Sequence, residues 1–408
     1  MNPETIFNSY NSPVPPVRRD LELIPINDKG REILYFHDSL KYMEPNFALD
    51  LQVQPILSLL TGRHSIAQIA NLLNNSIGRD ELLSFIQFLD NHLILESKNF
   101  KNNSEKYEIE FEASGVRKAA LAGQSYPADQ NSYEQFINEL LNTQGSPEVQ
   151  PKKALFAPHI ELTIGKNSYS RAFSSLKGIA PKRVVIFATA HYAGLYGSLY
   201  DNYPFIGTQK DFELPGRVFS TDKKVMDTLY QNSDATGFTL YDRAHRIEHS
   251  IETHLVFLDQ IWKHSFEIVP ILISSFDELF YKKNGDLGSK LNAFSDQIRS
   301  LDEKDTFYLI SGDLSHIGKK FGDSEAASQI REKASLSDRK FIRISEENDA
   351  DSLLQQIGRN YDAYRVCGFS PLLTFMKAFP GIKGTELSYE WWDETERESA
   401  VSFGAIGY

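Results

Sequence analysis

The chain has 408 residues, of which 41% are hydrophobic and 24% charged, which is typical of folded proteins and long enough for two domains. Its 43 Lys and Arg against 55 Asp and Glu give a net charge of −12, which argues against a nucleic-acid partner. One cysteine excludes an intramolecular disulfide, and no apolar run approaches the about 20 residues that cross a bilayer. Without a signal-peptide pattern at the start, we expect a soluble cytoplasmic protein with no membrane partner.

Residues 1–17 are rich in proline, which removes backbone donors, and we predict a flexible arm there. Residues 18–98 predict a small α+β domain. Two strands, 18–26 and 31–38, are joined by a turn at 27–30, a third extended piece follows at 40–45, and three helical segments and a short strand complete the domain. The polar and charged segment 99–116 predicts a linker or an exposed ribbon.

Residues 117–408 predict a second, larger α/β domain. Apolar runs rich in Val, Ile and Phe alternate with segments of helical periodicity, which is typical of buried parallel strands with helices on both faces of the sheet. We predict strands at 154–160, 183–191, 266–273 and 306–314, and helices at 132–142, 166–176, 223–231 and 250–262.

Polar side chains follow three of these strands where each one ends. His159 and His191 close two strands, and Asp313 follows a third, with His316 three residues later. A single histidine in such a place is more often a hydrogen-bonded loop residue. Because ligand sites gather at the carboxyl ends of strands in open α/β sheets, three in equivalent places predict one shared site.

The run from Arg243 to His254 holds a second cluster. On a helix, His245 and His249 would be neighbours one turn apart, as would Glu248 and Glu252. The HExxH pattern of zinc peptidases is absent. A polar helix start is the plain interpretation; we favour residues that orient metal ligands supplied by the strand ends.

Cys367 precedes Gly368 in the sequence Val-Cys-Gly. A lone buried cysteine is often only a small hydrophobic residue. With two histidines its thiolate would complete a ligand set that zinc, copper and iron accept, and the soft sulfur favours copper(I). Three protein ligands would leave a coordination position open.

These motifs together resemble the Memo-like family, whose microbial members are called AmmeMemoRadiSam system protein B. The resemblance covers residues 117–408. Its motifs, in chain order, are Ala122-Gly123 with Tyr126-Pro127, Ala157-Pro158-His159, Thr189-Ala190-His191, Glu248-His249-Ser250-Ile251-Glu252 with His254-Leu255, Ser311-Gly312-Asp313-Leu314-Ser315-His316, and Val366-Cys367-Gly368.

The resemblance implies a sheet flanked by helices like that of the LigB-type class III extradiol dioxygenases. It implies that His159, His191 and Cys367 hold iron or copper, with zinc less favoured, and that His316 is the catalytic acid or base beside Asp313. Supporting or cavity residues would be Glu161, His249, Glu252 and His254. The chain departs from the family at Ile160-Glu161, at Thr189-Ala190 and at Val256, positions where the family usually has Ala-Gly, Pro-Ser and Pro.

Residues 18–98 more weakly resemble the PqqD-like peptide-binding fold, which shares its shape with winged-helix domains. They carry eight Lys and Arg and eleven Asp and Glu, and this net charge of −3 argues against DNA binding. Peptide capture at a sheet edge is one hypothesis, and a structural appendage is the other.

Two functions of the whole chain stay open, and the sequence does not decide whether it is an enzyme. One is a mononuclear iron or copper oxidoreductase with redox or oxygen-dependent chemistry on an unknown small molecule or peptide. The other is a non-catalytic protein that handles copper or iron or serves as a scaffold. A zinc hydrolase is a third, less favoured hypothesis. The family's system name implies a radical SAM protein and an AMMECR-type protein as partners.

Overall fold

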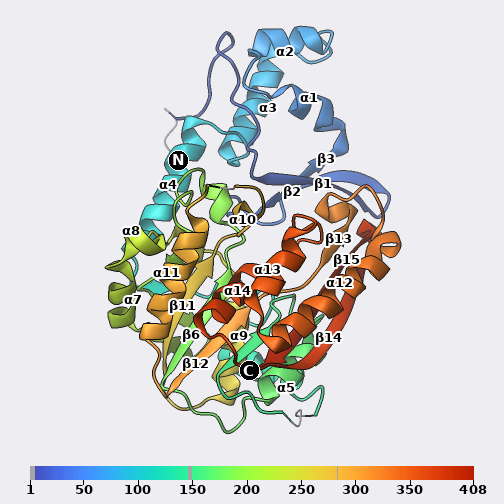
Figure 1. Cartoon of the computed structure of the whole chain (residues 1–408). Coiled ribbons are helices and arrows are strands. Elements are labelled where there is room, and N and C mark those ends of the chain that lie inside the picture. The colour runs from blue at the N-terminus through green and yellow to red at the C-terminus, as the bar shows by residue number, and fades with distance from the viewer. Residues whose placement is uncertain (1–4, 146–148, 283) are drawn as a thin grey trace. The chain divides into compact units, whose positions relative to one another are not determined.

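The computed structural model describes residues 5–145, 149–282 and 284–408 (Figure 1). The chain divides into two compact units, one that ends at Ala113 and one that runs from Ser114 to Tyr408. Within the described ranges, no helix has both the length and the apolar character that a membrane span requires.

The first unit contains an antiparallel sheet in the order β1-β2-β3. The predicted hairpin is confirmed, and its loop is the pair Lys29-Gly30, both at positive φ, as a two-residue turn between twisted strands requires. The third strand lies later than the predicted segment 40–45. The elements are β1 (Leu21–Asp28), β2 (Arg31–Asp38), β3 (Ala48–Asp50), α1 (Gln54–Leu59), α2 (Ile66–Leu72), α3 (Arg79–Asn91) and α4 (Lys98–Ala113).

The prediction of a loose arm is wrong for the described residues 5–17. Val14 is buried in the core of the first unit, and its backbone N–H donates to the carbonyl of His64 over 2.9 Å. Val17 N–H donates to the carbonyl of Leu60 over 3.1 Å. Prolines remove donors from this segment, but the donors that remain are satisfied by the domain on which it packs.

The predicted linker 99–116 is also corrected, because Lys98–Ala113 forms helix α4 of the first unit. Two contacts of side chains on this polar helix attach it to the rest of the first unit. The hydroxyl of Tyr42 donates to the buried carboxylate of Glu108 over 2.5 Å, and the guanidinium of Arg18 lies 4.2 Å from the ring centre of Phe100. Tertiary contacts of this kind stabilise a helix whose composition alone suggests an exposed segment.

The second unit is built on a mixed sheet, in which nine strands of the described chain take part in the order β10-β7-β11-β6-β12-β5-β15-β13, with β14 paired to β15. The four predicted strands are confirmed as β11, β6, β12 and β5, which run parallel to one another. The last strands were not predicted: β15 lies antiparallel beside β5 and continues the sheet. The strands are β5 (Ala154–Ala157), β6 (Arg183–Thr189), β7 (Phe205–Gly207), β10 (Phe238–Thr239), β11 (Glu267–Ile273), β12 (Thr306–Ser311), β13 (His316–Gly318), β14 (Thr385–Glu394) and β15 (Ser399–Gly407).

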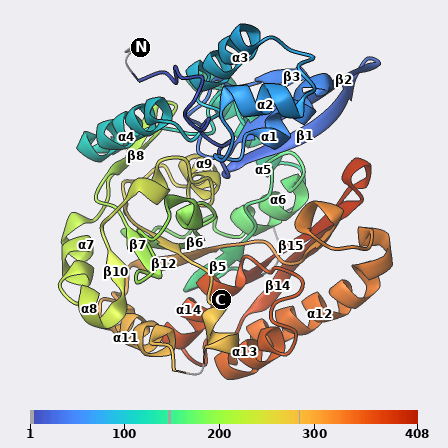
Figure 2. The same ribbon diagram turned by 90° about the horizontal axis from the view of Figure 1, so that it is seen from above.

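Helices cover both faces of this sheet, as Figure 2 shows for α5, α6 and α9 on one side and α11, α13 and α14 on the other. Alternation along β6 explains the two layers, because Val184 and Ile186 enter one core and Val185 and Phe187 the other. The helices are α5 (Gln130–Leu141), α6 (Lys166–Ser174), α7 (Lys223–Tyr230), α8 (Ser233–Thr236), α9 (Glu252–Ile261), α10 (Glu278–Tyr281), α11 (Leu287–Ser300), α12 (Ala327–Glu347), α13 (Ala350–Gly358) and α14 (Phe369–Ala378). A small sheet joins β4 (Val116–Arg117), β8 (Asp211–Leu214) and β9 (Arg217–Phe219).

Candidate functional site

The site lies at the carboxyl ends of three neighbouring parallel strands, in the order β6, β12 and β5. His191 follows β6, Asp313 follows β12 and His159 follows β5. The centres of the His159 and His191 rings lie 4.7 Å apart, so these two predicted residues are brought together. Strand order, which the sequence does not contain, makes the three strand ends adjacent.

His159 is buried, and its neighbours fix which ring nitrogen carries the proton. Ser311 Oγ donates to the carbonyl of Ser250 over 2.7 Å and lies 3.0 Å from His159 Nδ1. Because the single hydroxyl proton is already used, Ser311 accepts from Nδ1–H, and the lone pair of the neutral ring is on Nε2. Burial, with the neighbouring histidines, holds the pKa of His159 well below its usual value, so the ring is neutral.

Cys367 lies on the other side of this nitrogen, with Sγ 3.3 Å from His159 Nε2. The sulfur also accepts the backbone N–H of Asp313 over 3.2 Å. Two glycines permit this approach: a Cβ on Gly312 would lie 2.1 Å from the Cα of Gly368. Burial raises the pKa of the thiol, so that in the absence of a metal it is protonated at neutral pH.

Glu248 binds the second imidazole. Its carboxylate lies 3.0 Å from His191 Nδ1 and accepts the backbone N–H of His191 over 2.8 Å. It also accepts the N–H groups of His249 and Ser250 over 2.9 and 3.1 Å. Burial opposes the charge on His191, but Glu248 and Cys367 together outweigh it and raise the pKa of His191 to about 10. With Nδ1 on a carboxylate, Nε2 is the nitrogen left for a ligand.

His249 forms a third imidazole beside these two. Its ring stacks on that of His191 with centres 4.6 Å apart, and it lies 5.2 Å from that of His159. The side chains of His191 and His249 are 27% and 26% exposed, whereas that of His159 is 3% exposed. The cluster is therefore buried on one side and open on the other.

Two sets of candidate metal-ligand atoms result, and within each set all atoms lie within 4.8 Å of one another. They share His159, which joins His191 and His249 in one set and Asp313 and Cys367 in the other. The donor chemistry fits a metal: a neutral imidazole with its lone pair on Nε2, a thiol, and a carboxylate–histidine pair of the kind that surrounds protein-bound metals.

Asp313 and His316 contribute two groups with shifted pKa values. Burial raises the pKa of Asp313 to about 7, and burial lowers that of His316 to about 4. Nδ1 of His316 lies 3.0 Å from the carbonyls of Leu314 and Arg365, which can only accept, so this nitrogen carries the proton. The lone pair of the neutral His316 ring is then on Nε2, which can take up a proton.

Glu161 and Glu252 are placed away from this cluster. The carboxylate of Glu161 is exposed and accepts the N–H of Thr163 and the hydroxyl of the same residue. Glu252 is buried and pairs with Arg117, and it also accepts the backbone N–H of Ala120 over 2.8 Å. Both carboxylates are therefore occupied by contacts within the second unit rather than by imidazoles.

The helix expected around His245 and His249 does not form. A short 3-10 helix covers Arg243–His245, and α9 begins only at Glu252, so the i,i+4 argument is wrong. His245 turns to the carbonyl of Ile206, with its Nε2 3.0 Å away. His254 is buried, and among the described residues neither of its ring nitrogens has a hydrogen-bond partner. Burial lowers its pKa to about 3.

Two residues at the centre of this arrangement act on the imidazoles: Glu248 belongs to the cluster 243–254 in which we expected residues that orient metal ligands, whereas Ser311 was named only as part of a motif. Glu248 holds His191, and Ser311 sets the proton on His159. Glu248 stands in the same motif as Glu252, and only its place in a loop rather than on the helix separates the two roles. The sequence also contained a signal for Ser311, because it is the last residue of the strand that leads to Asp313.

The second unit is a mixed α/β sheet with histidine and aspartate side chains at the carboxyl ends of its parallel strands and a cysteine beside them in the loop before α14. These features define a class of α/β proteins with a candidate metal centre. A sequence model of the Memo-like protein family matches residues 117–407, which is more than half of the chain. The chain therefore belongs to the Memo-like family.

Individual relatives support this assignment. A MEMO1 family protein of Aquifex aeolicus is 24% identical over 403 residues, which cover 96% of this chain and 99% of the relative. A MEMO1 family protein of Nitrosopumilus maritimus is 22% identical over 304 residues, covering 72% of this chain and 99% of its own, and one of Thermus thermophilus is 25% identical over 293 residues, covering 71% and 82%. The Aquifex alignment is long enough to include the first unit as well.

Proposed function

We propose that the second unit is a mononuclear iron or copper protein with His159, His191 and Cys367 as ligands, and that it carries out redox or oxygen-dependent chemistry on an unidentified substrate. One distance carries the proposal. Metal–sulfur and metal–nitrogen bonds of about 2.3 and 2.0 Å in tetrahedral geometry place the two donor atoms about 3.5 Å apart. Sγ of Cys367 and Nε2 of His159 lie 3.3 Å apart.

A bound iron or copper ion would supply one-electron chemistry and Lewis acidity at the open side of the cluster. The protein's own groups would position the substrate and move protons. His316 Nε2 would take a proton from a substrate hydroxyl, since its Nδ1–H is already held by two carbonyls. Asp313, with a pKa raised to about 7 by burial, would hold or release a proton near neutral pH.

Metal content tests the ligand assignment. Protein purified without chelator should hold about one equivalent of iron or copper, and Cys367→Ala should lose most of it. His264→Gln is the matched control, because His264 Nε2 bonds to the carbonyl of Pro181 within the second unit and outside the cluster. Equal metal content in the wild type and in Cys367→Ala would refute the assignment.

A non-catalytic role in metal handling is the second candidate. The depth of His159, whose side chain is 3% exposed, favours it, because buried ligands slow the release of an ion. The variant His316→Gln separates the two functions. An enzyme should lose oxygen consumption in the presence of ascorbate while its metal content stays unchanged. If both variant and wild type bind the metal and neither consumes oxygen, the handling role is the better account.

For the first unit we propose recognition of a peptide or protein. Support comes from its antiparallel sheet, in which β1 and β3 are the outer strands and can each accept an added strand. The two helices α2 and α3 pack behind it on the shared core. A fluorescent peptide library titrated against the full chain, with Glu22→Pro to block the edge of β1, tests this proposal. Unchanged binding in this variant and in one blocked at β3 would refute it.

A further inference from the structure

A cavity of about 480 Å³ borders the candidate metal centre at Cys367. It lies at the carboxyl ends of β6 and β11, where Thr189 and Ser274 contribute to its wall, and the segment 361–367 forms the other side. Its volume lies in the range of small-molecule sites, about 300–1,000 Å³. The wall beside the centre is fixed, because Thr189 Oγ1 donates to the carbonyl of Cys367 over 2.9 Å.

The charges on the wall of this cavity do not cancel. Asp277, Asp362 and Arg365 line it. Asp323 lies 2.5 Å from Arg365 Nη2 and neutralises that cation. In the part of the chain that the structure describes, neither Asp277 nor Asp362 has a Lys, Arg or His within 4.0 Å. Burial, together with the neighbouring Asp277, raises the pKa of Asp362 to about 7, so this carboxyl is partly ionised at neutral pH. With Asp277 it leaves the cavity an excess of negative charge, which attracts a cation.

A neutral side chain of the cavity suits the same kind of ligand. The ring of Tyr361 lines the cavity and is 67% exposed, and aromatic faces attract ammonium and guanidinium groups. Asp362 is held in place by the backbone N–H of Val366, 3.1 Å from each of its carboxylate oxygens.

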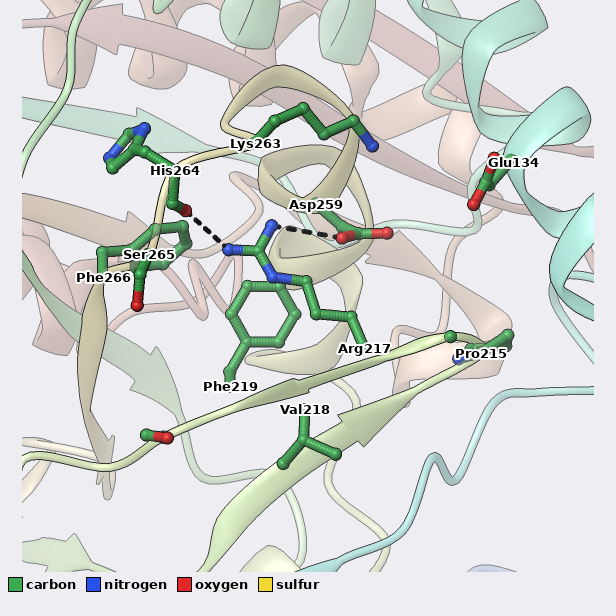
Figure 3. Close-up of a pocket in the computed structure, with 12 residues that line it drawn as sticks. Glu134, Pro215, Arg217, Val218, Phe219, Asp259, Lys263, His264, Ser265 and Phe266 are labelled. Carbon is green, nitrogen blue, oxygen red and sulfur yellow. Dashed lines mark hydrogen bonds and ion pairs between the residues drawn. The ribbon is translucent and has the colours of Figure 1, made fainter.

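A second cavity of about 370 Å³ shows the contrast (Figure 3). There Arg217 bonds to Asp259 over 3.3 Å and to the carbonyls of Trp262 and His264 over 2.8 and 2.9 Å. Lys263 and Glu134, which also line it, carry opposite charges. The positive and negative side chains of this cavity compensate one another, so it has no excess charge that would attract a charged ligand.

We infer that the cavity beside Cys367 binds the amino or guanidino group of a small molecule or of a peptide side chain. Asp277 and Asp362 provide the countercharge and Tyr361 the aromatic side chain. The statement that this cation is part of the substrate of the metal centre rests on the proposed function. The cavity and its charge are independent of the proposed function.

Three small probes of similar length with different head groups test the charge preference: butylamine, 1-butanol and butyrate. Calorimetric titration at low salt should show butylamine binding at least about tenfold more tightly than the other two, the effect of one hydrogen bond to a charged group. Nα-acetyl-lysine amide distinguishes a peptide side chain from a free amine. It should match or exceed butylamine if the natural ligand is a peptide, and bind more weakly if it is a free amine.

Two single variants, Asp277→Asn and Asp362→Asn, should each weaken butylamine about tenfold. Asp351→Asn is the control, since that carboxylate pairs with Lys377 on the protein surface. If Asp362→Asn proves unstable in a melting experiment, the exposed Asp277 carries the test. Equal affinity for butyrate, or unchanged butylamine affinity in the variants, would overturn the inference.

Metal content measured on the same samples keeps the two proposals apart. Loss of amine binding with normal metal loading in the Asp277→Asn variant supports the cation site alone. Amine binding that persists in a protein whose Cys367→Ala variant loads metal normally would leave the cation site standing and remove the metal assignment.

Discussion

Replacing Glu252 by Gln should destabilise the second unit by about 3–5 kcal/mol, the range for removing one partner of a buried ion pair. The side chains of Arg117 and Glu252 are 1% and 0% exposed. The carboxylate also accepts the backbone N–H groups of Ala120 and Leu121 over 2.8 and 2.9 Å and the hydroxyl of Tyr126. Gln keeps the volume, but it removes the charge and points an N–H group at donors, so Arg117 is left as an uncompensated buried cation.

Urea unfolding followed by tryptophan fluorescence measures this change. Beside Glu252→Gln, the single variants Glu252→Met and Arg117→Met and the double variant that combines them complete a thermodynamic cycle. The double variant should recover only part of the loss, because no lone charge is left, while the N–H groups of Ala120 and Leu121 still lose the carboxylate that accepted from them. Metal content should be unchanged in Glu252→Gln, since its carboxylate contacts the segment 117–126 and no imidazole.

The same pair gives a pH dependence of defined sign. Burial opposes the charge on Glu252, but Arg117 outweighs it and lowers the pKa of that carboxyl. A lowered folded-state pKa gives stability that is complete above the unfolded-state pKa of about 4.3 and is lost as the pH falls toward the folded-state value. Glu252→Gln should abolish this part of the acid sensitivity. A loss below 1 kcal/mol at pH 7, or loss of metal without loss of stability, would refute the reasoning.

Three further outcomes are expected. Ser311→Ala should lower metal affinity 10- to 100-fold, as for other residues that orient a metal ligand. Ser295→Ala, which removes another buried hydroxyl, should not change the affinity. Equal affinities of the two variants would contradict the role given to Ser311. Burial lowers the pKa of His254 to about 3, whereas the unfolded state binds the proton near pH 6.5, so protonation destabilises the wild type as the pH falls. The free energy of unfolding of His254→Leu should therefore fall by about 1 kcal/mol less than that of the wild type between pH 6 and 5. An unchanged pH profile in urea unfolding would count against this prediction. Arg217→Ala should cost about 2 kcal/mol in thermal or urea unfolding, because it loses its bonds to Asp259 and to the carbonyls of Trp262 and His264. A loss no larger than that of Arg331→Ala, whose partner is the exposed Asp393, would be inconsistent with this role.

Local signals were sufficient for much of the second unit. The strands β5, β6, β11 and β12 were predicted because each is a short apolar run that is buried on both faces, a property that the run itself encodes. Their polar terminal residues could be found in the same way. What the runs could not encode is the strand order or the pairing of β15 beside β5, because these depend on contacts between residues far apart in the chain.

In the first unit, local sequence signals were not sufficient. Residues 5–17 and α4 are polar or rich in proline, and composition predicted an arm and a linker. A few distant contacts decide otherwise, such as Val14 in the core and Glu108 with Tyr42. Local propensity is worth tenths of a kcal/mol per residue, so one buried contact of this kind outweighs it.

Glu248 and Glu252 divide what the sequence determined from what only the tertiary structure decided. The sequence alone placed both in one motif with His249, and it supplied the imidazoles, the thiol and the carboxylates of the candidate centre. Helix α9 starts at Glu252, four residues after the first residue of the motif, which leaves Glu248 in a loop against His191 and directs Glu252 to Arg117. A buried carboxylate takes the cation or donor that the fold brings to it, and that partner lies 57 residues away in one case and 135 in the other.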